Sequence, residues 1–145
     1  MTDPIKCFML EPVERASFTR NGASITTTIY RAPDGSRYNA GHGPATLESG
    51  EEIPQAPVGA MWDCDWYRGA KHENGTQYDR NPDGLILAVR TPGGDWVIDG
   101  PSFSDRKETG MWTRSGTAPN ITATPSILMP KYHGWLRDGY LVEVV

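Results

Sequence analysis

Short runs of hydrophobic residues alternate with polar ones along this chain, and turn-forming residues separate the runs. Ile25 to Ile29 is β-branched throughout, which favours a strand over a helix. The preceding Asn21-Gly22 is the strongest two-residue hairpin signal, so residues 18–30 are predicted to form a hairpin. Ile5 to Leu10 is a further strand-like run.

A second hairpin is predicted in the centre of the chain, where Leu85 to Arg90 is followed by a Thr-Pro-Gly-Gly turn and by Asp95 to Ile98. With a period of two, Leu87 and Val89 share one face of the first strand, and Trp96 is available opposite them. This pattern predicts two antiparallel strands.

The C-terminus repeats the arrangement. Trp135 to Arg137 and Tyr140 to Val144 flank Asp138-Gly139, which is a type I′ turn signal. The segment from Ala32 to Gly59 is rich in Gly, Pro, Asp and Ser, so it is predicted to be a long surface loop with at most one short strand.

The helical period is nearly absent, apart from at most one turn near Glu48 to Ile53. The chain is therefore predicted to be mainly β: a single compact domain over residues 1–145, with short antiparallel strands and hairpins, long Gly/Pro-rich loops and little helix. The length of 145 residues is in the commonest size range for one domain.

Composition narrows the functional class. The 16 Gly and 12 Pro indicate many turns, while five Trp and six Tyr argue against disorder. The net charge of −4 provides no general attraction for a polyanion, so general nucleic-acid binding is not expected.

The chain has two cysteines, Cys7 and Cys64, which we interpret as reduced thiols because a small secreted domain normally carries more. The N-terminus lacks the basic start and apolar run of a signal peptide, and no apolar run is long enough to cross a membrane. We expect a cytoplasmic protein without a membrane segment.

Metal and catalytic motifs are weak. Asp63 and Asp65 would share one face of an extended chain, with His72 and Glu73 a few residues on and His42 elsewhere as further ligand types for zinc or magnesium. His133 is a further weak candidate. No established metal-binding spacing is present, so a solvated acidic loop is the preferred interpretation, and no cofactor is expected. Ser126 and His133 could pair as nucleophile and base, but no strained nucleophile turn surrounds Ser126.

Residues 79–84 match the opening of a calcium loop, with oxygen side chains at positions 1, 3 and 5 and Gly at 6. Position 12 of that loop requires a bidentate Glu, and here it is Arg90. A hairpin turn is therefore the preferred interpretation.

Tryptophans in a small β domain usually form its core and rim. The alternative is a stacking surface with cationic neighbours that contact an anion. The candidate ligand-binding residues on this alternative are Trp112, Arg114, His133, Trp135 and Arg137.

Residues 96–139 carry three motifs: Trp-Val-Ile-Asp-Gly-Pro-Ser, then Met-Trp-Thr-Arg-Ser-Gly-Thr-Ala-Pro-Asn, then Tyr-His-Gly-Trp-Leu-Arg-Asp-Gly. Here the chain resembles the phage branch of the uncharacterised family catalogued as domain of unknown function 6527. Bacterial members of that family have Cys and His residues that suggest zinc. Of that pattern only His133 is present here, because Tyr132 stands in the place of the Cys.

The leading hypothesis is a non-enzymatic binding protein of phage or prophage origin that acts in the host cytoplasm. It would bind a host protein or sequester a small anionic, nucleotide-like ligand, with counter-defence as one such role. The competing hypotheses are a metal-dependent, hydrolase-like enzyme that uses His133 with carboxylates such as Asp99 or Asp63, and a virion structural component. Formation of a homo-oligomer through a sheet edge is a further expectation.

Overall fold

The computed structural model describes residues 3–64, 83–99, 112–124 and 126–144. The chain divides into two compact units. Unit 1 comprises Met1–Phe8 with Val58–Val145, and unit 2 comprises Met9–Pro57. The division into units does not test whether residues 1–145 form a single domain, so the single domain stays a prediction.

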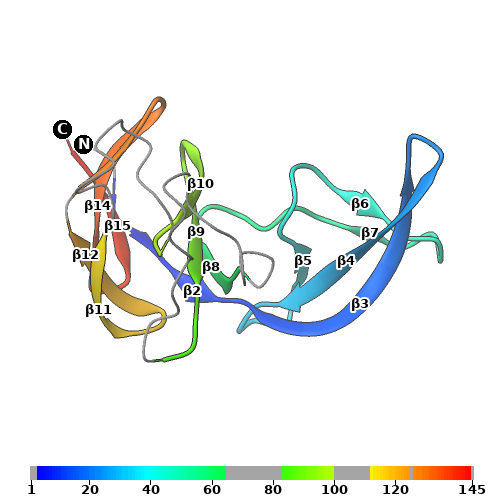
Figure 1. Cartoon of the computed structure of the whole chain (residues 1–145), viewed down its shortest axis with the longest axis horizontal. Coiled ribbons are helices and arrows are strands. Elements are labelled where there is room, and N and C mark those ends of the chain that lie inside the picture. The colour runs from blue at the N-terminus through cyan, green and yellow to red at the C-terminus, as the bar shows by residue number, and fades with distance from the viewer. Residues whose placement is uncertain (1–2, 65–82, 100–111, 125, 145) are drawn as a thin grey trace, which may run out of the picture. The chain divides into compact units, whose positions relative to one another are not determined.

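Unit 1 contains two four-stranded antiparallel sheets and a separate hairpin (Figure 1). The first sheet has the order β1 (Ile5–Lys6), β15 (Tyr140–Glu143), β14 (Tyr132–Arg137) and β13 (Ile127–Met129). The second has the order β10 (Gly94–Val97), β9 (Leu87–Thr91), β8 (Ala60–Asp63) and β2 (Phe8–Met9). The hairpin joins β11 (Thr113–Thr117) to β12 (Asn120–Thr124).

The predicted central hairpin is confirmed, with Trp96 paired to Val89 in the register of β9 and β10. All five residues of β9 are buried, so this strand is covered on both faces. The Trp96 side chain is fully buried. Trp96 therefore belongs to the core, which is the usual place for tryptophan in a small β domain.

The two predicted type I′ turns are confirmed by their backbone angles. Asn21 and Gly22 have φ values of 52° and 79°, and Asp138 and Gly139 have values of 47° and 78°. At Gly139 the neighbouring chain also leaves no room, because a β-carbon there would lie 2.8 Å from the Pro119 carbonyl oxygen. Glycine is thus required at this turn for both conformation and space.

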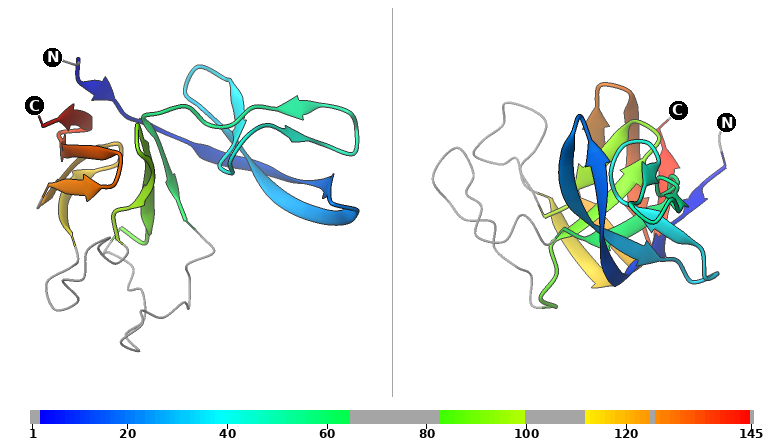
Figure 2. Two further views of the ribbon diagram at one scale, coloured as in Figure 1. Left: turned by 90° about the horizontal axis from the view of Figure 1, so that it is seen from above. Right: turned by 90° about the vertical axis from the view of Figure 1, so that its right-hand side faces the viewer.

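Unit 2 is organised around a long ribbon. β3 (Glu11–Arg20) and β4 (Ala23–Arg31) run antiparallel over their whole length, and both views in Figure 2 show them together. β5 (Arg37–Asn39) pairs with β4, and β6 (Ala45–Thr46) pairs with β7 (Glu52–Ile53). The apolar cluster beside the ribbon consists of Ile29, Leu47 and Ile53, with Ala16 and Phe18 packed against it.

The prediction for residues 32–59 was wrong in one respect. At most one short strand was expected there, and the structure has three, β5 to β7. Strands of two or three residues are too short to show a period of two, so the Gly- and Pro-rich composition concealed them. Hydrogen bonds of the Asn39 side chain stabilise this region. Its amide nitrogen donates to the Ile53 carbonyl at 2.9 Å, and its oxygen accepts a hydrogen bond from the Gly41 N–H at 2.8 Å.

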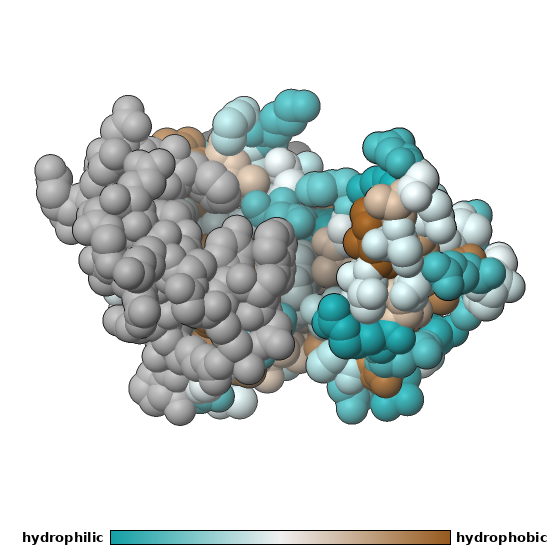
Figure 3. All heavy atoms as spheres, turned by 45° about the vertical axis from the view of Figure 1, so that its right-hand side comes forward, coloured by the Kyte–Doolittle hydropathy of each residue, from teal (hydrophilic) through white to brown (hydrophobic). Residues whose placement is uncertain are grey.

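The mainly β fold class is confirmed: across the described ranges every regular element is a strand. The described residues include no helix with the length and apolar character needed to span a membrane. In Figure 3, hydrophilic and neutral side chains cover most of the coloured surface, with separate small hydrophobic areas between them.

Phe8 and Gly59, both in unit 1, lie on either side of unit 2 in the sequence. The Phe8 N–H donates a hydrogen bond of 3.1 Å to the Gly59 carbonyl. Unit 2 is therefore inserted between adjacent positions of unit 1.

Candidate binding surface

Alternate residues of β14 face opposite sides of its sheet. Tyr132 and Leu136 are buried, whereas His133 and Arg137 are exposed and Trp135 is partly exposed. A strand with a period of two therefore brings three of the five predicted site residues into one exposed row.

The register of the sheet places further exposed residues, and the partly exposed Val142, beside this row. Leu128 is opposite His133, Val142 is opposite Trp135, Tyr140 is opposite Arg137, and Lys6 is opposite Tyr140. The Val144 N–H donates to the His133 carbonyl at 2.9 Å. We name as the outer face Lys6, Leu128, His133, Trp135, Arg137, Tyr140, Val142 and Val144.

Of the six large hydrophobic side chains that are exposed among the described residues, three lie on the outer face. Leu128 is 53% exposed, Tyr140 39% and Val144 38%. Figure 1 shows β14 and β15, which carry most of these residues, lying side by side. Large apolar side chains gathered on one exposed face are typical of a contact surface, whereas single ones are ordinary.

Trp135 and Arg137 interact with each other on this face. The guanidinium carbon of Arg137 lies 4.6 Å from the centroid of the Trp135 ring, which is cation–π geometry. The contact holds both side chains against the sheet, so less side-chain entropy remains to be lost when a partner binds.

Gly134 lies in the inner row of β14, between Tyr132 and Leu136. A β-carbon at Gly134 would lie 2.5 Å from the hydroxyl oxygen of Tyr132. The Tyr132 ring therefore occupies the space that a side chain would need, and its burial raises the pKa of its phenol. Glycine at this position lets the sheet keep Tyr132 on the inner side.

The Ser126 and His133 pair is brought together. The Ser126 Oγ lies 3.5 Å from the His133 Nε2. This distance is at the outer limit of hydrogen bonding, so the hydroxyl and the imidazole form at most a weak hydrogen bond. The pair is close in space without the geometry of an activated nucleophile.

The Trp112 side chain packs against other residues of the fold and does not lie in the exposed row on β14. Its ring meets Trp96 edge to face, with centroids 5.2 Å apart and planes at 74°. Its indole N–H donates to the Ser126 carbonyl at 3.4 Å. Trp112 thus links the core tryptophan to the segment that precedes β13.

Arg114 is occupied by carboxylates within the fold. Its side chain is only 4% exposed, and its terminal nitrogens bind both oxygens of Asp83 at 2.7 and 2.9 Å. Its Nε donates to Asp99 at 2.9 Å, and one terminal nitrogen also donates to the Leu85 carbonyl at 3.3 Å. Burial alone would lower the pKa of Arg114, but the two carboxylates outweigh it and raise the pKa.

Sequence reasoning missed the role of three aspartates near the start of β9. Their carboxylates accept hydrogen bonds from the backbone N–H groups of three consecutive residues. The pairs are Asp83 with Leu85 at 3.1 Å, Asp63 with Ile86 at 2.9 Å, and Asp99 with Leu87 at 2.9 Å. Only Asp83 lies close to its partner in sequence, which is the spacing of an Asx turn. The other two pairings depend on the tertiary fold.

The metal candidates are dispersed. Asp63 binds the Ile86 N–H, His133 lies on the outer face, and Asp65 and His72 lie outside the described residues, as do residues 79–82 of the calcium-like segment. Within the described ranges, no group of three or more His, Cys, Asp or Glu side chains is placed to hold a metal ion.

Both cysteines are buried and free. Burial raises the pKa of Cys7 and of Cys64 to about 12. A thiol with so high a pKa carries almost no thiolate at neutral pH, and the thiolate is the reactive form. The interpretation of both residues as reduced thiols agrees with this burial.

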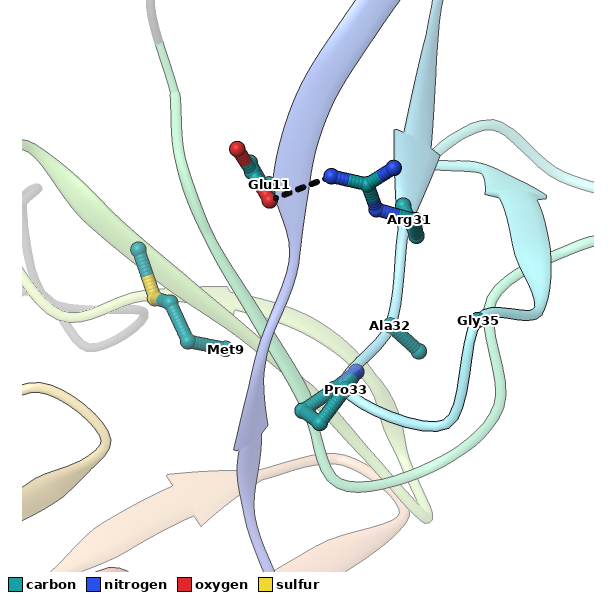
Figure 4. Close-up of a pocket in the computed structure, with 6 residues that line it drawn as sticks. All are labelled: Met9, Glu11, Arg31, Ala32, Pro33 and Gly35. Atoms are coloured by element: carbon teal, nitrogen blue, oxygen red, sulfur yellow. Dashed lines mark hydrogen bonds and ion pairs between the residues drawn. The ribbon is translucent and has the colours of Figure 1, made fainter.

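A hollow of about 320 Å³ lies in unit 2 at the base of the ribbon (Figure 4). Glu11 and Arg31 form an ion pair of 3.1 Å at its wall, and Met9, Ala32, Pro33 and Gly35 complete the lining. Both charged side chains are more than half exposed, at 66% and 51%. The wall is therefore solvated, and it contains none of the predicted site residues.

Comparisons of the chain with protein-family models, curated proteins and solved structures found no match.

Proposed function

We propose that this protein is a non-enzymatic binding protein and that its partner, a host protein, contacts the outer face. The observation that carries the proposal is the row of His133, Trp135 and Arg137 on β14, beside the exposed Leu128 and Tyr140. Aromatic residues and arginine are the residue types enriched in binding hot spots.

A protein partner is favoured over a small anionic ligand. Of the two arginines in the predicted site, Arg114 already binds Asp83 and Asp99. A small anion would have to bind on the exposed side of the sheet, where water competes for each hydrogen bond. A protein surface instead buries the apolar side chains together with the cations.

The biological setting is proposed on the resemblance of residues 96–139 to phage proteins. It supports a phage or prophage origin, action in the host cytoplasm and a counter-defence role. This part of the proposal is an analogy at the level of the family, whereas the binding role is argued from the chemistry of the surface.

Selection from a displayed library of random peptides tests the surface. We expect clones that bind the wild-type protein and lose binding to Trp135→Ala. The matched control is Val13→Ala, because Val13 is also an exposed apolar residue, at 39%, but lies in unit 2. Retained binding to this control separates a specific effect from a general loss of apolar surface.

An absence of clones that depend on Trp135 would overturn the proposal. Calorimetry with cyclic and linear nucleotides provides the second arm, in which we expect no heat of binding. Nucleotide binding that Trp135→Ala abolishes would replace the protein partner with a small ligand.

A further inference from the structure

We infer that the partner presents an acidic surface with an exposed aromatic or aliphatic side chain to the outer face. This inference rests on the proposed function and adds the chemistry of the partner. It comes from the distribution of charge over the two sides of one sheet.

The cations of the sheet lie on its outer side. Lys6 is opposite Tyr140, and Tyr140 is opposite Arg137, so the two cations occupy the strand positions on either side of Tyr140. His133 lies two residues before Trp135, on the same side of β14. Residues opposite each other in adjacent strands point to the same side, so these groups form one surface.

The outward positions of β1, β13, β14 and β15, all of which the structure describes, include no carboxylate. Glu143 is opposite Gly134 and therefore belongs to the inner row. Asp138 is in the turn between β14 and β15, at the end of the sheet. The outer face is thus basic in a protein whose net charge is −4.

This charge pattern favours a different protein over a second copy of the same chain. In a symmetric contact between two copies, each residue of one copy meets a different residue of the same face on the other. A face that carries Lys6 and Arg137 but no carboxylate would therefore offer its own copy no opposite charge. Like charges brought together at an interface oppose binding, whereas carboxylates opposite them favour it.

The apolar residues of the face favour a protein over a nucleic acid. Leu128, Val142 and Val144 offer no stacking surface for a base, whereas they can bury an aliphatic or aromatic side chain. Trp135 and Arg137, already in contact at 4.6 Å, would receive a carboxylate beside an apolar group.

The sequences of the selected peptides test this inference separately from the proposed function. We expect the clones that depend on Trp135 to be enriched in Asp and Glu next to an aromatic or aliphatic residue. One such peptide should lose affinity by about tenfold or more with Arg137→Glu and weaken with added salt. Arg137→Met keeps the apolar stem and should lose less, and thermal denaturation confirms that each variant folds.

Other outcomes each overturn the inference. Peptides that depend on Trp135 but are neutral or basic would overturn the acidic partner and leave the proposed function in place. A dimer that Trp135→Ala dissociates would indicate a second copy as the partner. Binding of a single-stranded thymidine oligonucleotide that requires Trp135 would indicate a nucleic acid.

Discussion

The two units stabilise their irregular segments with hydrogen bonds from different kinds of buried polar side chain. In unit 1 one such group is charged: the Arg114 side chain, 4% exposed, binds Asp83 and Asp99. In unit 2 one is neutral: the Asn39 amide, in a residue that is 4% exposed, binds backbone groups of Gly41 and Ile53. Charged groups depend on pH and on their partners, whereas an amide depends only on hydrogen-bond geometry, so the two units should respond differently to substitution and acid.

The largest effect is expected for Arg114→Ala. The substitution leaves the buried Asp99 without its cation, and removal of one partner of a buried ion pair costs about 3–5 kcal/mol. Urea denaturation measures the loss in the free energy of unfolding. Arg137→Ala is the control, since Arg137 is exposed, and a loss as large as that of Arg114→Ala would contradict this account.

Asn39→Ala should be the next largest. The substitution removes the Asn39 donor from the buried Ile53 carbonyl, and an unsatisfied buried group costs about 1–3 kcal/mol. Hydrogen exchange should show the loss of protection among amides of unit 2. Equal loss of protection in β14 and β15 would instead show that the two units unfold together.

Acid should distinguish the units. Hydrogen bonds from Arg114 hold the pKa of Asp83 below its ordinary value of 3.8. The folded-state pKa is therefore lower than the unfolded one, so this contribution is present above the ordinary pKa and is lost as pH falls through the folded value. Asp83→Asn should reduce that loss on acidification, measured by urea denaturation at a series of pH values. Asn39→Ala should leave the pH dependence unchanged.

The smallest effect is expected for the ion pair at the hollow of unit 2. Glu11 and Arg31 are 66% and 51% exposed, and exposed pairs contribute about 0–1 kcal/mol. Glu11→Gln should therefore leave thermal stability nearly unchanged. A loss comparable with that of Asn39→Ala would show that the hollow has a structural role.

Local signals predicted much of the fold. Asn21-Gly22 and Asp138-Gly139 specify their turns by the backbone angles that these residues accept, so both hairpins follow from adjacent residues. The period of two likewise places His133, Trp135 and Arg137 on one side of a strand.

The parts that the sequence did not predict depend on distant residues. Arg114 was a candidate anion receptor because of its charge, but its partners are 15 and 31 residues away in sequence. Pairings over such separations have no periodic signature. The edge-to-face contact of Trp112 with Trp96 is of the same kind.

The hydrogen bond from the Phe8 N–H to the Gly59 carbonyl has a consequence for how this chain can change. Residues 9–57 leave unit 1 and return to it, so they form one closed loop in its chain. Doubling the length of a flexible loop costs only about 0.6 kcal/mol in closure entropy. We therefore expect unit 1 to tolerate replacement of residues 9–57 by a shorter turn or by another folded module.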